Sequence, residues 1–233
     1  MKDSGIKNYQ YLMLLAMLYI TFDLSSMVYA YKQIQIGPIS GMASSINFPL
    51  TYAMMDIITE VYGYNIAKKL IWFGILCDSI FVVIVPLLSY IPSPSISQDI
   101  AYHQVLSSLW RAFIGQSIGV LLGAFTNAYL ISKWKLLVKG RYFWLRSIGS
   151  STLGEFMMLS VSIFIALSGT ISFILLIKII GFTYLYKIIF ALVAAPFVVI
   201  IASFLKKKEG VDAYDYYINF NPLEFFTRSK HLK

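Results

Sequence analysis

The sequence has little charge and almost no cysteine or histidine. Only 13% of its 233 residues are charged, whereas soluble domains usually carry about 25%. So few charges cannot cover the surface of an ordinary soluble domain, and this class is therefore excluded. The single cysteine, Cys77, cannot form an internal disulfide. The two histidines, His103 and His231, lack metal-ligand spacing to any partner.

Motifs for soluble catalysis are missing as well. The sequence contains no glycine-rich phosphate-binding loop, so the chain cannot hydrolyse ATP by itself. No nucleophile or metal-ligand set accompanies its acidic residues. We therefore predict no enzyme activity, no cofactor and no metal. A membrane enzyme that uses Asp56 and Glu155 as an acid–base pair is the minor alternative.

Long apolar runs are what the sequence does have. Hydrophobic residues make up 58% of the chain, and its mean hydropathy is +0.72. A helix needs about 20 mostly apolar residues to cross a bilayer. The fold class that we predict is an all-α polytopic membrane protein with six transmembrane helices. These spans are expected at roughly 9–31, 45–64, 70–91, 104–132, 143–167 and 182–205.

Two boundary predictions accompany these spans. The stretch 171–205 is too long for one untilted span, and we expect Gly181 to divide it into a short outer segment and the sixth helix. The first apolar run has no small-residue cleavage site, so it is predicted to be a retained helix and not a signal peptide. We expect one membrane domain over 1–208 and a cytoplasmic tail over 209–233.

Basic residues set the predicted orientation. The formal net charge of +8 could indicate nucleic acid, but the positive charges lie in short clusters between apolar runs. The loops 93–103 and 168–170 have no lysine or arginine. With six spans, the positive-inside rule places both termini in the cytoplasm, and we expect no nucleic-acid partner. The clusters are Lys68 and Lys69; Lys133, Lys135, Lys139 and Arg141; and Lys206, Lys207 and Lys208.

Carboxylates at membrane depth are the main candidates for a functional site, since each costs at least ~2.5 kcal/mol on insertion scales. Asp56 precedes Lys68 by twelve residues, and Glu155 follows Phe143 by twelve. Both therefore lie ~18 Å into the membrane, near the midplane where transporters bind small solutes. Tyr52, Asp56 and Glu60 share one face of the second helix.

Other polar residues allow two interpretations. Asn127 can contact a polar ligand or bridge two helices. Arg146 and Lys187 are expected near opposite interfaces, where snorkelling is a simple explanation. Asp23 and Asp78 each stand alone in a span, and hydrogen bonding between helices is the commoner reason for such residues.

Three glycines, Gly115, Gly119 and Gly123, repeat at four-residue spacing. This spacing lets another helix approach closely. The partner can be a helix of the same chain or of a second copy, so a homodimer is an open alternative.

Three stretches of this chain resemble the queuosine precursor transporter family, also called the vitamin uptake transporter family. The first and most specific, FPLTYAMMDIITEVYGY over 48–64, resembles the family's second-helix signature. The others are GAFTN over 123–127, with SKWK and KGRYFWLR over 132–135 and 139–146, and SIGSSTLGE over 147–155. The resemblance covers roughly residues 10–208.

The resemblance implies import of queuine or of 7-cyano- or 7-aminomethyl-7-deazaguanine across the bacterial inner membrane, for tRNA modification. It also implies a six-helix fold similar to substrate-binding subunits of energy-coupling-factor transporters. The family's ligand-binding positions fall on Asp56, Asn127, Glu155 and Lys187. Ala124 and Met158 depart from the family pattern, because many members carry a polar or acidic residue there. These departures leave the cargo within the class open.

The chemistry of a deazaguanine suits such a site, because a carboxylate can accept both of its adjacent N–H donors. Its flat ring can stack on an aromatic side chain, either Tyr52 or Phe48. The alternative function is a substrate-capture subunit that needs an ATPase and a scaffold partner. The bulky first helix disfavours it. The predicted substrate-binding residues are Asp56, Glu60, Asn127, Glu155, Lys187, Tyr52 and Arg146.

Overall fold

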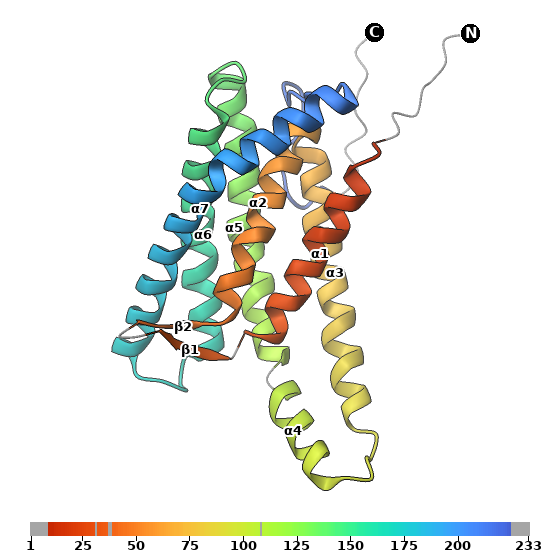
Figure 1. The fold of residues 1–233 in the computed structure, drawn as a ribbon, viewed down its shortest axis with the longest axis vertical. Coiled ribbons are helices and arrows are strands. Elements are labelled where there is room, and N and C mark those ends of the chain that lie inside the picture. The colour runs from red at the N-terminus through yellow and green to blue at the C-terminus, as the bar shows by residue number, and fades with distance from the viewer. Residues whose placement is uncertain (1–8, 31, 37–38, 108, 225–233) are drawn as a thin grey trace, which may run out of the picture.

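The structure, a computed structural model, describes residues 9–30, 32–36, 39–107 and 109–224. Figure 1 shows long helices side by side, with a small hairpin and one short helix at the same end of the bundle. The elements in chain order are α1 (Leu12–Val28), β1 (Gln33–Ile36), β2 (Ile39–Met42), α2 (Ser44–Tyr62), α3 (Tyr64–Ser89), α4 (Ile96–Leu106), α5 (Leu109–Leu137), α6 (Phe143–Leu167) and α7 (Phe173–Glu209).

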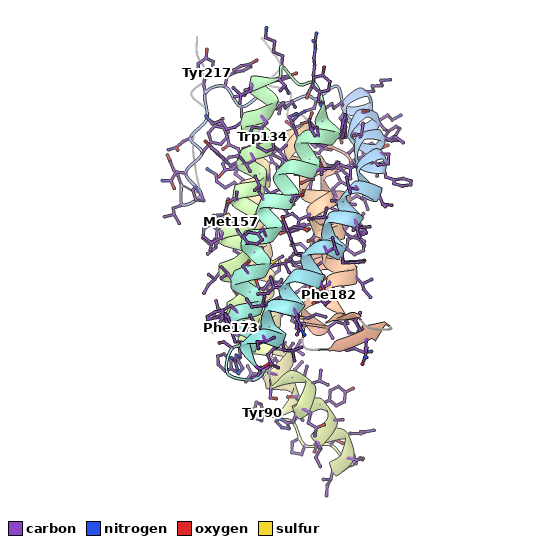
Figure 2. All side chains as sticks on the ribbon, turned by 90° about the vertical axis from the view of Figure 1, so that its left-hand side faces the viewer. Tyr90, Trp134, Met157, Phe173, Phe182 and Tyr217 are labelled. Carbon is purple, nitrogen blue, oxygen red and sulfur yellow. The ribbon has the colours of Figure 1, made fainter. Side chains whose placement is uncertain are left out.

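The helices confirm an all-α, multi-pass membrane protein. Among the described residues, four helical stretches are long and apolar enough to cross a membrane. They are α3, α6, α7 and the stretch Ile96–Leu137, which includes α4 and α5. α1 is apolar but has only 17 residues, and α2 is not among these stretches, so the count of six spans stays a prediction. Large apolar side chains cover the outside of the bundle (Figure 2), as lipid contact requires.

Two expected boundaries were wrong. Gly181 does not divide the last apolar stretch, because α7 is continuous from Phe173 to Glu209. A glycine inside a helix costs only about 1 kcal/mol, and Gly181 faces open space where nothing forces a break. At ~1.5 Å per residue α7 exceeds a hydrocarbon core of ~30 Å, and it crosses its neighbours obliquely in Figure 1. The fourth run also starts later than expected, since α4 is a separate helix before Leu109.

The glycine repeat of α5 packs against α6 within the same chain. A Cβ added at Gly115 would lie 2.9 Å from the carbonyl oxygen of Ser162, and one at Gly119 would lie 2.9 Å from that of Met158. At Gly123 it would overlap the carbonyl oxygen of Gly154. The small residues therefore bring two backbones together inside the monomer, and they need no second copy.

Gly123→Ala is expected to destabilise the protein by about 1–3 kcal/mol, because α5 and α6 must move apart. Gly181→Ala is the control, since a new methyl group there meets nothing within 4 Å; it should be neutral or slightly stabilising. Thermal unfolding in detergent measures both. Equal melting temperatures for the two variants would mean that the helices do not pack this closely.

The start of α1 and the end of α7 lie together, because Tyr11 N donates a 2.8 Å hydrogen bond to Glu209 Oε1. We call this the basic end, since it carries the three clusters of lysine and arginine. Residues 211–224, the strap, run back across it. Ala213 N donates to Val61 O at 3.0 Å, and Trp72 Nε1 donates to Pro222 O at 2.8 Å. The described part of the predicted tail therefore packs on the bundle.

Candidate functional site

Asp56 lies on α2 with 2% of its surface exposed, and two other helices hold its carboxylate. Oδ1 accepts a 2.6 Å hydrogen bond from Asn127 Nδ2 of α5. Oδ2 accepts from the hydroxyls of Ser147 and Ser151 of α6. The structure thus brings Asp56 and Asn127 together, and Asn127 bridges two helices.

Sequence analysis missed the two serines as individual site residues. Ser147, Ser151 and Glu155 follow one another at four-residue spacing, so they lie on one face of α6. This four-residue spacing is the sequence feature that could have identified the two serines. All three line a cavity between α2, α6 and α7 that encloses about 290 Å³, its open mouth included.

Glu155 differs from Asp56 because its acceptor capacity is free. It is 3% exposed, yet no side chain in the described part of the chain hydrogen-bonds its carboxylate. Tyr52 lines the same cavity, and its hydroxyl is buried without a hydrogen-bond partner. A ligand in this cavity would therefore meet one preorganised carboxylate, Asp56, and one unpartnered carboxylate.

Lys187 does not snorkel. It is 1% exposed, and its Nζ has no hydrogen-bond partner. The Nζ lies 4.6 Å from the centre of the Phe48 ring and 5.8 Å from that of Tyr52, distances typical of cation–π contacts. Lys187 also lines a larger cavity that encloses about 560 Å³ with its opening, together with Gln116 and Met158.

Two aromatic rings whose centres are 5.9 Å apart line these cavities. Phe48 lines the larger cavity and Tyr52 the smaller. A small cavity contacts both rings and Ala124. The two positions that depart from the family pattern, Ala124 and Met158, therefore both line cavities. A free acceptor, a free donor and aromatic faces suit a flat heterocycle that carries both donors and acceptors.

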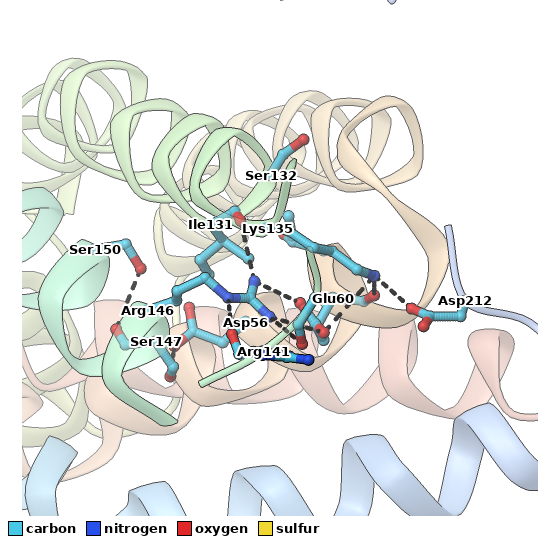
Figure 3. Close-up of polar contacts among 12 residues, drawn as sticks. Asp56, Glu60, Ile131, Ser132, Lys135, Arg141, Arg146, Ser147, Ser150 and Asp212 are labelled. Carbon is cyan, nitrogen blue, oxygen red and sulfur yellow. Dashed lines mark hydrogen bonds and ion pairs between the residues drawn. The ribbon is translucent and has the colours of Figure 1, made fainter. Parts of the chain in front are cut away.

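Glu60 and Arg146 form a separate cluster, shown with its partners in Figure 3. Glu60 follows Asp56 by one helical turn and is therefore nearer the basic end. The Arg146 guanidinium contacts both Glu60 oxygens, at 2.9 and 3.1 Å. Lys206 Nζ lies 2.5 Å from Glu60 Oε1, and Lys135 Nζ lies 3.7 Å from the same oxygen. Neither Glu60 nor Arg146 lines the cavities described above. Both residues already have partners, and their role in substrate binding stays a prediction.

Asp212 ties the strap to this cluster. Its Oδ1 lies 2.5 Å from Lys135 Nζ and 2.9 Å from Lys206 Nζ. Partial burial raises the pKa of Asp212, but the hydrogen bonds and charges of the two lysines outweigh this effect and bring the pKa below its usual value. Asp212 therefore stays ionised at neutral pH and links the strap to α5 and α7.

A multi-pass helical bundle in which buried ionisable groups beside a cavity lack hydrogen-bond partners is typical of a membrane transport protein. The model of the family described as "Putative vitamin uptake transporter" matches residues 42–201, and the chain belongs to this family. No curated protein and no solved structure matches the chain. Similarity to energy-coupling-factor subunits therefore stays a prediction.

Proposed function

We propose that this chain imports a queuosine precursor, either queuine or 7-cyano- or 7-aminomethyl-7-deazaguanine, across the bacterial inner membrane. In this proposal the basic end faces the cytoplasm. Six helices span the bilayer, namely α1, α2, α3, α5, α6 and α7. The observation that carries the proposal is the buried pair of Glu155 and Lys187. Each is at least 97% buried, Lys187 Nζ has no hydrogen-bond partner, and no described side chain hydrogen-bonds the Glu155 carboxylate, so a ligand can supply these hydrogen bonds.

A deazaguanine has complementary groups. Its adjacent N–H donors match the Glu155 carboxylate, which can accept both. Its ring carbonyl can accept from Lys187 Nζ, and its flat face can lie against Tyr52 or Phe48. Asp56 supports the same cavity as a second acceptor, because Asn127, Ser147 and Ser151 fix its orientation.

Binding to the purified protein tests the proposal. Calorimetry with the three 7-deazaguanines should show saturable binding, with guanine as the comparison ligand. Glu155→Gln and Asp56→Asn should each weaken binding by about 100-fold, the equivalent of ~3 kcal/mol for hydrogen bonds to a charged group. Glu224→Gln, an exposed carboxylate in the strap, is the matched control.

Two outcomes would contradict the proposal in different ways. No binding of any 7-deazaguanine by the folded protein would show that the cargo is another compound. Normal binding by both cavity variants would show that the ligand lies elsewhere.

A further inference from the structure

A second pair of buried carboxylates lies outside the proposed substrate contacts. Asp23 of α1 is 3% exposed and Asp78 of α3 is 2% exposed. Both accept from one amide nitrogen, Gln116 Nε2 of α5, at 2.8 Å from Asp23 Oδ1 and 3.4 Å from Asp78 Oδ2. The other oxygen of Asp78, Oδ1, is buried without a hydrogen-bond partner. The sequence placed Asp23 and Asp78 apart, and the fold brings them to one donor.

The two carboxylates have no ion-pair partner in the described part of the chain. No lysine or arginine of the described residues forms an ion pair with either carboxylate. The titratable neighbours are Tyr19 of α1, which adjoins Asp23 beside Gly74, and Tyr52 of α2, which shares a small cavity with Tyr19. From α5, the amide of Gln116 donates to both carboxylates.

Two ionised carboxylates cannot share one neutral donor in a low-dielectric interior without a large electrostatic penalty. A proton between them removes one charge and turns one carboxylate oxygen into a donor. A metal ion fits less well, because Gln116 turns its amide nitrogen to both carboxylates. Among the described residues no group of three or more histidine, cysteine or acidic side chains could hold a metal.

Gln116 contacts both this pair of carboxylates and a cavity that the proposed substrate would enter. Its side chain lines the larger cavity that also contains Lys187. A ligand that engages Gln116 would withdraw the hydrogen bond that stabilises the ionised form of the pair. Ligand binding and protonation would then favour each other, and linkage makes this effect reciprocal.

We propose that Asp23 and Asp78 hold a proton that is cotransported with the substrate, and that Gln116 couples its binding to the substrate cavity. The proton would bind with substrate from the outer side and leave with it into the cytoplasm. The cotransport part of this proposal rests on the proposed function. The shared proton itself does not.

Infrared spectroscopy of the ligand-free protein tests the shared proton without any cargo. We expect a C=O stretching band of a protonated carboxyl group at neutral pH, and its loss in Asp23→Asn/Asp78→Asn. The difference between the two spectra separates this band from other carboxyl groups. An unchanged spectrum would overturn the proposal, whatever the cargo proves to be.

Ligand binding and liposome uptake test the coupling. Affinity should fall by up to about tenfold per pH unit above neutral pH, because one proton is bound with the ligand. Asp78→Asn mimics the protonated state. It should bind ligand with little pH dependence and exchange ligand across the membrane, yet lose accumulation driven by a proton gradient. Asp23→Asn provides a second variant, and Asp99→Asn on α4 is the control.

Three results separate the possible failures. Binding that does not depend on pH, or uptake driven by a sodium gradient alone, would overturn proton coupling while the proposed import stands. The absence of any binding would contradict the proposed import. In that case the infrared result still decides whether the pair holds a proton.

Discussion

Lys187→Met is expected to raise the free energy of unfolding of the ligand-free protein and to weaken ligand binding at the same time. A buried polar group without a hydrogen bond costs about 1–3 kcal/mol in proteins, and Lys187 Nζ has no such partner. Methionine keeps the length of the side chain and removes the polar group. Thermal unfolding in detergent measures the first effect, and calorimetry with a 7-deazaguanine measures the second.

Lys178→Met is the matched control, because Lys178 is an exposed lysine on the same helix. This variant should change neither quantity. A less stable Lys187→Met protein with normal affinity would show that Lys187 is a packing residue. In that case Lys187 would not be a ligand contact, and the buried pair with Glu155 could not carry the proposed function.

Replacing Glu60 should lower the free energy of unfolding more than replacing Arg146. Glu60→Gln removes the anion that Arg146, Lys135 and Lys206 share. The two lysines keep their ion pairs with Asp212, but Arg146 is left buried without an ion pair. Removing one partner of a buried ion pair costs about 3–5 kcal/mol. Arg146→Met should cost less, because Glu60 keeps Lys206 at 2.5 Å and Lys135 at 3.7 Å. Chemical denaturation in detergent compares the two variants.

The double variant Glu60→Gln/Arg146→Met provides the control. It should be more stable than Glu60→Gln alone, since Arg146, the cation that loses its ion pair without Glu60, is also replaced. If the cluster is structural, the folded double variant should also bind ligand with normal affinity. Lost affinity in a fully folded double variant would instead place Glu60 or Arg146 in contact with the substrate.

Several features follow from local sequence. Low charge and long apolar runs fix the membrane class, because transfer free energy depends on composition and length. Counting residues along the two helices predicted Asp56 and Glu155 at similar depth, and both line one cavity. The predicted helix boundary at Gly181 was wrong for an equally local reason. A single glycine costs too little free energy to end an apolar helix, and no neighbouring atom at Gly181 forces a break.

The hydrogen-bond and ion-pair partners of the buried polar side chains, in contrast, depend on contacts between helices that are distant in sequence. The sequence could not say that Asn127 would bind Asp56, that Arg146 would pair with Glu60, or that Asp23 and Asp78 would meet at Gln116. Each contact needs the rotation and tilt of two helices, which side-chain packing across the whole bundle decides. The sequence by itself determined which polar groups lie within the long apolar runs. Only the tertiary structure decided which of them have hydrogen-bond partners, and the proposed ligand contacts, Glu155 and Lys187, are buried without one.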